Sequence, residues 1–246
     1  MKNKLKNLFN KIANMLFPEN LKCIFCGDDI PDFDSKPFCD KCEKSLPINN
    51  GKKCKICDLE ISGESEVCDF CKTNHKFFDK TFAPFKYEGD VQKAVIKFKG
   101  ENAKYLAKPM ASLIVKYLGD EMNNIDFVVP VPSSEKSMKR RGYNQCNLLA
   151  KEIEKLSGKE VRYDLLVKDK ETAEQKNLPF AERKTNIESA FKLLTHKRTK
   201  GKNILLIDDV MTTGATANAC ARLLKPHCNK VYVAVFARNT ISPTKK

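Results

Sequence analysis

Two adjacent carboxylates, Asp208 and Asp209, are followed closely by a loop of threonines around a glycine. Carboxylates only accept hydrogen bonds, so this pair suits sugar hydroxyls or a hydrated Mg²⁺ ion. The hydroxyl and backbone N–H groups of the loop suit a phosphate, particularly where a helix begins. The loop residues are Thr212, Thr213, Gly214, Ala215 and Thr216. The pattern predicts a ligand that carries a phosphate at one end and a diol nearby, as ribose 5-phosphate does.

The elements on either side of these residues position them. Residues 204–207 are four apolar residues in a row, which is typical of a parallel strand buried on both faces. The acidic pair follows at the carboxyl end of this strand, and apolar spacing predicts a helix over residues 217–225. Open α/β sheets bind ligands at the carboxyl ends of their strands. The alternative interpretation is an ordinary strand-to-helix turn in which the acidic pair caps the helix.

Four Cys-x-x-Cys pairs form an internal repeat, in which residues 54–61 resemble residues 23–30. Two such pairs complete a tetrahedral Cys₄ site, which is a structural zinc site with no open position for catalysis. The repeat favours sequential pairing, first with second and third with fourth, and an interleaved arrangement stays open. We expect about two zinc ions, each contributing folding free energy on the order of 10 kcal/mol, and we expect chelation to unfold this segment alone. The pairs are Cys23/Cys26, Cys39/Cys42, Cys54/Cys57 and Cys68/Cys71.

A basic cluster follows the strand predicted at residues 126–131. It contains Lys139, Arg140 and Arg141, and Tyr143 lies just beyond it. Adjacent arginines bind phosphates bidentately, and an aromatic ring offers a stacking surface to a base. Loops that rise from the carboxyl ends of parallel strands lie at one edge of the sheet, so we expect this loop and the threonine loop to border one crevice. A solvated basic loop without a ligand is the alternative.

The overall charge favours a polyanionic partner. The net charge is +14, from 45 Lys and Arg against 31 Asp and Glu, which suits nucleic acid or an anionic membrane, although a Lys-rich composition also arises without such a partner. Residues 1–17 have the spacing of a basic amphipathic helix, which could lie on a membrane, on DNA or on the protein's own surface.

The chain has no apolar run of transmembrane length and no pattern of a secretory signal. Eleven cysteines without an export signal indicate a reducing compartment. We therefore expect a cytoplasmic protein, with attachment to the inner face of the membrane as an option.

Alternation of apolar strands with helical patterns predicts an α/β fold with a Rossmann-like parallel sheet, preceded by a small zinc-ribbon segment. Further strands are expected at residues 81–87, 161–167 and 230–237, and a polar stretch at residues 169–185 is typical of a lid or binding loop. The expected domains are a basic helix at residues 1–20, a double zinc ribbon at residues 21–75 and the sheet domain at residues 76–246.

Residues 204–216 resemble the phosphoribosyl-pyrophosphate (PRPP) binding motif of the type I phosphoribosyltransferases. In that family the paired acids bind the ribose hydroxyls and the loop binds the 5-phosphate, with Mg²⁺ accompanying PRPP. The resemblance therefore gives the ribose role to Asp208 and Asp209, and the phosphate role to residues 212–216. It leaves the catalytic residue and the acceptor unassigned.

The chain as a whole resembles the ComF family of competence proteins. The resemblance is carried by the Cys-x-x-Cys repeat and by residues 85–89, 128–132, 140–145, 182–186 and 208–216. It implies a zinc-bearing N-terminal segment, a type I phosphoribosyltransferase fold, and a role in bringing transforming single-stranded DNA into the cytoplasm together with other DNA-uptake proteins at the inner face of the membrane.

Two functions stay open at this point. One is a DNA-handling factor whose site recognises a phosphoribosyl ligand. The other is an active transferase that uses PRPP and Mg²⁺ on an unidentified acceptor. Two departures from the enzyme pattern matter: we expect no base-binding hood after Arg238, and the loop after Val131 is not the short pyrophosphate loop, although the Arg140–Arg141 segment is a candidate replacement.

Overall fold

The computed structural model describes residues 22–30, 36–100, 103–169 and 189–240. It divides the chain into two compact units, Met1–Leu46 and Pro47–Lys246. The helix predicted at residues 1–17 lies outside the described residues, as do the motif at residues 182–186 and nearly all of the polar stretch at 169–185. The domain limits expected after residues 20 and 75 remain a prediction.

Each cysteine repeat folds as a knuckle followed by a short helix. The Cys23 N–H donates to the Asp28 carbonyl at 2.7 Å, and the equivalent Cys54 N–H donates to the Leu59 carbonyl at 2.8 Å. Helix α2 (Asp40–Ser45) follows the first knuckle, and helix α3 (Asp69–Thr73) follows the second. The two ribbons therefore share one local structure, but the first belongs to the Met1–Leu46 unit and the second to the larger unit.

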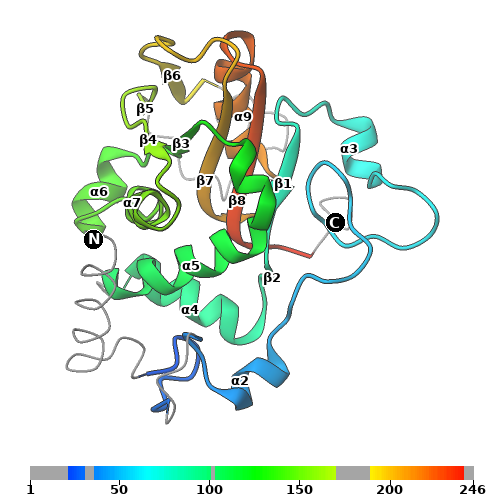
Figure 1. Cartoon of the computed structure of the whole chain (residues 1–246), viewed down its shortest axis with the longest axis vertical. Coiled ribbons are helices and arrows are strands. Elements are labelled where there is room, and N and C mark those ends of the chain that lie inside the picture. Colours follow the sequence, from blue (N-terminus) through cyan, green and yellow to red (C-terminus); the bar gives the residue numbers. More distant parts are fainter. Residues whose placement is uncertain (1–21, 31–35, 101–102, 170–188, 241–246) are drawn as a thin grey trace, which may run out of the picture. The chain divides into compact units, whose positions relative to one another are not determined.

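The larger unit is built on a parallel sheet with the strand order β1-β8-β7-β3-β4, and β2 also pairs with β8. Figure 1 shows β7 and β8 near the middle of this sheet. A separate antiparallel pair joins β5 to β6. The predicted α/β fold with a parallel sheet is confirmed. The strands are β1 (Lys80–Phe82), β2 (Phe85–Lys86), β3 (Phe127–Pro130), β4 (Glu160–Val161), β5 (Leu166–Lys168), β6 (Phe191–Leu193), β7 (Asn203–Met211) and β8 (Lys230–Arg238).

Two of the predicted strands are each divided in the structure. Residues 81–87 form β1 and β2 because Pro84, which lies between them, has no N–H for a sheet ladder. Residues 161–167 are interrupted by a bend, where Arg162 and Asp164 form an ion pair with a 2.8 Å nitrogen–oxygen distance. The final strand, expected at residues 230–237, is confirmed as β8.

Helices cover both faces of the sheet. Helices α5 and α7 pack against β3, β7 and β8, and α9 packs against the opposite face with Val231, Val233 and Val235 of β8. Pro109 lies in the first turn of α5, where its missing N–H costs nothing. Within the described ranges no helix is long and apolar enough to span a membrane. The helices of the larger unit's sheet region are α4 (Gly89–Gly100), α5 (Ala107–Leu118), α6 (Glu135–Arg141), α7 (Gln145–Ser157) and α9 (Ala215–Leu224), with short 3₁₀ turns η1 (Lys104–Leu106), η2 (Gly119–Asn124) and η4 (Lys225–His227).

The second ribbon shares the hydrophobic core of the sheet. Its four cysteines, Leu59 and Phe70 belong to the same buried cluster as the apolar residues of α9 and of the sheet face beneath that helix. We therefore no longer expect chelation to leave the sheet domain unaffected, because the second ribbon is part of that domain's core.

A buried carboxylate fastens the second knuckle to the sheet. Asp58 has a left-handed φ of 57°, where the equivalent residue of the first ribbon is Gly27 with a φ of 83°. The Asp58 carboxylate accepts from the Ala83 N–H at 2.8 Å and from the Tyr117 hydroxyl at 3.2 Å. These bonds reach the segment between β1 and β2, and helix α5. The strained residue of the second repeat thus holds the ribbon in place.

Candidate functional site

The acidic pair lies within β7. The strand was predicted to end at residue 207, but it continues to Met211, because Asp208, Val210 and Met211 stay in register with β8. The two carboxylates therefore sit on the backbone of a paired strand at its carboxyl end. Pairing with β8 holds this part of the strand, so these side chains are fixed more firmly than they would be on a loop.

Lys99, from the end of α4, balances the charge of the pair. Its ammonium nitrogen lies 2.9 Å from Asp209 Oδ1, and the Asp209 side chain is only 9% exposed. Burial works against the charge of Lys99, but attraction from Asp209 outweighs it and raises the pKa of Lys99. An ammonium group thus lies directly beside the carboxylates.

Asp208 is held less favourably as a charged group. Burial, and then repulsion from Asp209, raise the pKa of Asp208 to about 6, while Lys99 opposes this shift. The Cys146 thiol donates to Asp208 Oδ1 at 3.3 Å. Burial and the nearby carboxylates raise the pKa of Cys146 well above its usual value, so this residue stays a protonated donor.

The threonine loop turns β7 into α9. Gly214 has a φ of 76° and is the N-cap residue of α9. A side chain at this position would meet the Met211 sulfur at 3.4 Å, and the positive φ itself favours glycine. The Ala215 N–H donates to the Thr213 hydroxyl oxygen at 3.3 Å. Residues 212–216, which we call the phosphate loop, thus present a helix N-terminus next to the acidic pair.

Backbone anchors hold Lys99 in position. The Tyr143 hydroxyl donates to the Phe98 carbonyl at 2.7 Å, and the Gln145 amide donates to the Lys99 carbonyl at 3.3 Å. Arg141 in turn donates to the Gln145 side-chain oxygen at 2.9 Å. The segment that follows β3 is therefore hydrogen-bonded to the end of α4. The sequence pattern did not indicate this contact.

The basic segment is a helix rather than a loop. Helix α6 (Glu135–Arg141) begins at Ser134, whose hydroxyl caps the Ser137 N–H, and it ends at Gly142 with a φ of 74°. Lys139 and Arg140 are exposed, whereas Arg141 is half-buried. The crevice expected between this segment and the threonine loop remains a prediction.

The stacking role expected for Tyr143 is not compatible with its position. The residue is only 6% exposed, its hydroxyl is bonded to the Phe98 carbonyl, and the Lys104 ammonium lies 5.3 Å from its ring centroid. A buried ring offers no free face to a base. The tyrosine packs against Phe98 instead, with ring centroids 6.4 Å apart.

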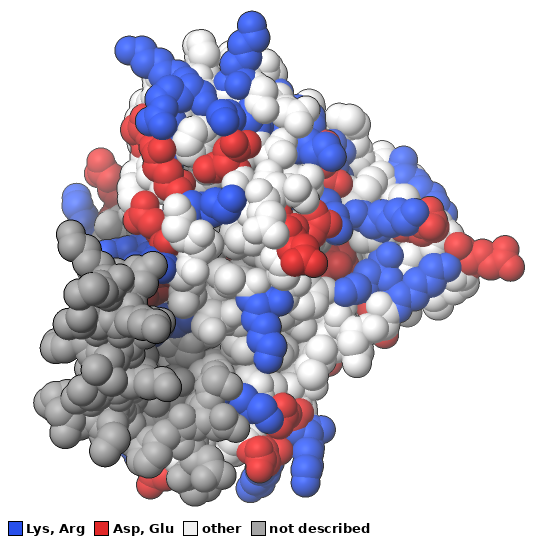
Figure 2. All heavy atoms as spheres, viewed as in Figure 1, with Lys and Arg blue, Asp and Glu red and all other residues white. Residues whose placement is uncertain are grey.

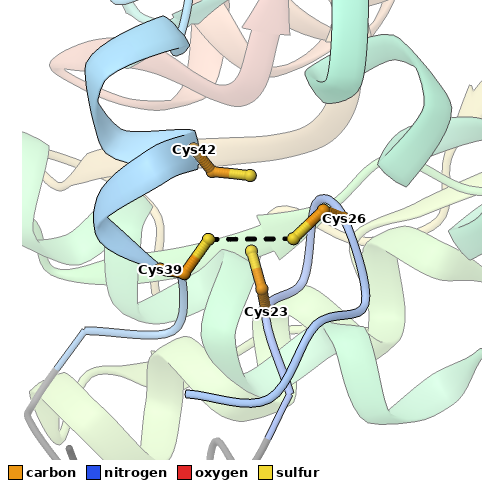
Figure 3. Close-up of side chains that lie close together, drawn as sticks. All are labelled: Cys23, Cys26, Cys39 and Cys42. Carbon is orange, nitrogen blue, oxygen red and sulfur yellow. Dashed lines mark hydrogen bonds between the residues drawn. The ribbon is translucent and has the colours of Figure 1, made fainter. Parts of the chain in front are cut away.

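The eight cysteines form two clusters with sequential pairing. Cys23, Cys26, Cys39 and Cys42 make the first cluster, and Cys54, Cys57, Cys68 and Cys71 make the second. Within each cluster all sulfur atoms lie within 4.8 Å of one another. Figure 3 shows the first four side chains pointing toward a common centre, with Cys26 and Cys39 Sγ atoms 3.7 Å apart. Four convergent thiolates fit tetrahedral zinc, so the clusters are consistent with two structural zinc ions.

Acidification is expected to weaken the binding of ribose 5-phosphate. Asp208, whose pKa is raised to about 6, takes up a proton between about pH 7.5 and about pH 5.5, and a protonated carboxyl accepts less well from a diol. One such proton lowers the affinity roughly fourfold at the lower pH. Titration calorimetry across this range measures the change.

Inorganic phosphate is the control, because it shares the ligand's own protonation but has no diol. An equal fall for both ligands would contradict a role for Asp208. Acidification acts in the opposite direction on the stability of the fold. Because the pKa of Asp208 is raised from its usual 3.8 in the folded protein, the contribution of Asp208 to stability is fully present below pH 3.8 and is lost as the pH rises through about 6.

Two domain families match the chain. Residues 12–77 match the double zinc ribbon domain, and residues 102–246 match the phosphoribosyl transferase domain. The second match covers more than half of the chain and agrees with the parallel sheet of the larger unit.

Several curated proteins are similar in sequence. Competence protein F of Haemophilus influenzae is 26% identical over 84% of this chain and 91% of that protein. Competence protein ComFC of Bacillus subtilis is 27% identical over 76% of this chain and 77% of that protein. DNA utilization protein YhgH of Escherichia coli is 32% identical over 40% of this chain and 43% of that protein.

Among solved structures, the adenine phosphoribosyltransferase of Saccharomyces cerevisiae is 15% identical, with a TM-score of 0.34, over 53% of this chain and 68% of that one. The two domain matches and the sequence similarity to the competence proteins point to the same family. The chain belongs to the ComF family of competence proteins, in which a double zinc ribbon is joined to a phosphoribosyltransferase domain.

Proposed function

We propose that this protein handles incoming single-stranded DNA during natural transformation and that its phosphoribosyltransferase domain binds a phosphoribosyl ligand such as PRPP. The observation that carries the proposal is the placement of two carboxylates and a phosphate loop at one strand end, in a chain similar over most of its length to a competence protein. On single-stranded DNA the phosphate loop would hold a backbone phosphate, whereas an internal deoxyribose has no diol for the acidic pair.

The ligand is divided between two groups of residues. Asp208 and Asp209 accept hydrogen bonds from the ribose hydroxyls or hold a hydrated Mg²⁺ ion, while the N–H groups and hydroxyls of the phosphate loop hold the 5-phosphate. The acids and the loop lie on one short chain segment and are separated only by Val210 and Met211.

Lys99 competes with the ligand for Asp209. It neutralises Asp209, and an arriving diol or Mg²⁺ ion competes for the same carboxylate. Once it is displaced from Asp209, the Lys99 ammonium stays next to the ribose. It lies on the side of the site formed by the residues that follow β3. An anionic group carried beyond the ribose, such as the pyrophosphate of PRPP, fits this position.

DNA binding is assigned to the exposed end of α6. Lys139 and Arg140 place two positive charges on a short helix. The residues after this helix hydrogen-bond to the end of α4, which carries Lys99. Figure 2 shows Lys and Arg side chains interspersed with Asp and Glu over the face displayed. A localised contact therefore has to be separated from general attraction by experiment.

An active transferase is the second candidate, favoured by the intact acidic pair and phosphate loop. It predicts Mg²⁺-dependent release of pyrophosphate from PRPP when the right acceptor is present. Release with a panel of amines, nucleobases and DNA would support it. Binding of PRPP without turnover on any acceptor favours the DNA-handling function.

The decisive experiment is a titration of the full chain with PRPP and single-stranded DNA in competition. Saturable PRPP binding in the presence of Mg²⁺, together with DNA binding, is the expected result. Absence of binding to either ligand would overturn the proposal. We further propose that the protein holds two structural zinc ions and works in the cytoplasm. There it would contact other DNA-uptake proteins at the inner face of the membrane.

Replacing both Lys139 and Arg140 with alanine is expected to weaken the binding of all single-stranded DNA sequences alike. Each lost phosphate contact on a single strand flattens the dependence of log K on log salt by about 0.7, so two contacts give about 1.4. Arg141 is left unchanged, because it holds Gln145. Fluorescence anisotropy at several salt concentrations measures the slope.

The matched control is a double alanine variant at Lys41 and Lys44, which are both exposed and lie in the other compact unit. It removes the same charge. If this variant changes affinity and slope as much as the α6 variant does, the net charge is only a general attractor.

A further inference from the structure

A buried arginine joins the phosphate loop to the second cysteine cluster. Arg238, the last residue of β8, is only 3% exposed. Its guanidinium donates to the Met211 carbonyl at 3.1 Å and also to the Thr212 carbonyl, which begins the phosphate loop. The same group donates to the Cys57 carbonyl at 3.0 Å and to the Cys57 sulfur at 3.6 Å. One rigid fork thus contacts both a cysteine of the cluster and the loop.

The chain that leaves the second ribbon packs behind the same loop. The Phe77 N–H donates to the Asn218 side chain of α9 at 2.8 Å. Phe78 is buried, and a side chain at Gly214 would meet its ring at 3.7 Å. The loop therefore rests on residues supplied by the ribbon as well as on its own strand.

The charges of this arrangement are complementary. Four thiolates around Zn²⁺ leave a net charge of about −2, and such a centre is stabilised by N–H donors to its sulfur atoms. Arg238 supplies a cation and a donor to Cys57, and it uses its remaining N–H groups on the loop. Its position toward the cluster therefore also sets its position toward the loop.

We propose that Arg238 is a positioning residue that couples zinc in the second cluster to the conformation of the phosphate loop, so that the second ribbon is part of the phosphoribosyl site. The consequence for ligand affinity rests on the proposed function; the coupling itself concerns the loop alone. The proposal concerns the second cluster alone, since the first belongs to the other compact unit.

Hydrogen exchange of the full zinc-loaded chain tests the coupling without any ligand. Arg238→Met is expected to raise exchange about tenfold in the peptide that covers residues 211–218, with β3 as the unaffected reference. Zinc release from the second cluster to a chelating dye should become roughly 10–100-fold faster, while release from the first cluster keeps its rate. A Cys26→Ser, Cys39→Ser variant identifies which phase belongs to which cluster.

Arg238→Lys serves if the methionine variant fails to fold, because it keeps the charge but loses the fork; it should give a smaller change in the same two places. Unchanged exchange at residues 211–218 together with unchanged zinc release in a folded variant overturns the proposal. A rise in exchange spread evenly over the sheet does so too, since it indicates general destabilisation.

A second arm uses ribose 5-phosphate. In the original chain this ligand is expected to slow zinc release from the second cluster only, because coupling between two sites is reciprocal. In Arg238→Met the ligand should leave both phases unchanged. If ribose 5-phosphate and PRPP fail to bind the original chain, the proposed function is wrong, and the exchange experiment alone decides the coupling.

Discussion

Asparagine at both Asp208 and Asp209 is expected to abolish measurable PRPP binding and leave the fold intact. The change keeps the size of both side chains and removes their charge. Hydrogen bonds to charged groups contribute about 1.5–3 kcal/mol each, so two such losses correspond to roughly two to four orders of magnitude in Kd. Titration calorimetry with PRPP and Mg²⁺ measures the loss.

Stability should change little, because the structure holds these charges at some cost. Burial and mutual repulsion disfavour the charged form of Asp208, and only Asp209 has a close cation in Lys99. We expect the free energy of unfolding to change by about 1 kcal/mol or less. The matched control is asparagine at Asp28 and Asp29, an exposed acidic pair in the other unit. Retained PRPP affinity in the first variant, or an equal loss in the control, would refute the assignment.

Removal of zinc is expected to act differently on the two ribbons. Purified protein should contain about two zinc ions per chain, each contributing on the order of 10 kcal/mol to the folding of its site. That is comparable to the whole stability of a typical domain. Because the second cluster lies in the core of the sheet domain, its loss should lower that domain's melting temperature sharply. Loss of the first should unfold only its own unit.

Serine at Cys26 and Cys39, compared with serine at Cys54 and Cys68, separates these outcomes. Each variant should retain about one zinc ion by metal analysis. Calorimetric melting should show an unchanged sheet transition for the first variant and a large downward shift for the second. Identical melting of the two, or a metal-free chain that keeps both ribbons ordered, would contradict this assignment.

The sequence predicted those features whose cause is local. A run of apolar residues followed by acids and a threonine-glycine loop defines β7, the phosphate loop and α9 within one short segment. The duplication of the knuckles likewise favoured the sequential pairing of cysteines that the structure contains. The extent of β7 was underestimated, because the residues that prolong it are polar and are held in the strand by β8.

Features that depend on distant partners escaped prediction. Lys99 ends an ordinary amphipathic helix, and only the folded sheet brings it to Asp209. Tyr143 follows a basic cluster and therefore suggested an exposed platform, whereas its ring fills the space beside Phe98. Arg238 reads as the end of a strand, and its two sets of partners are separated in the sequence by most of the domain.

The fork formed by Arg238 also bears on how the chain folds while it is being made. Arg238 lies 181 residues after Cys57, and among the described strands β1 pairs with β8 alone. Both cysteine clusters leave the ribosome long before the central strands exist, so they can take up metal early. The second ribbon must then wait, with part of its apolar surface uncovered, until β8 arrives. Until then we expect that ribbon to be open to metal loss, oxidation and capture by chaperones.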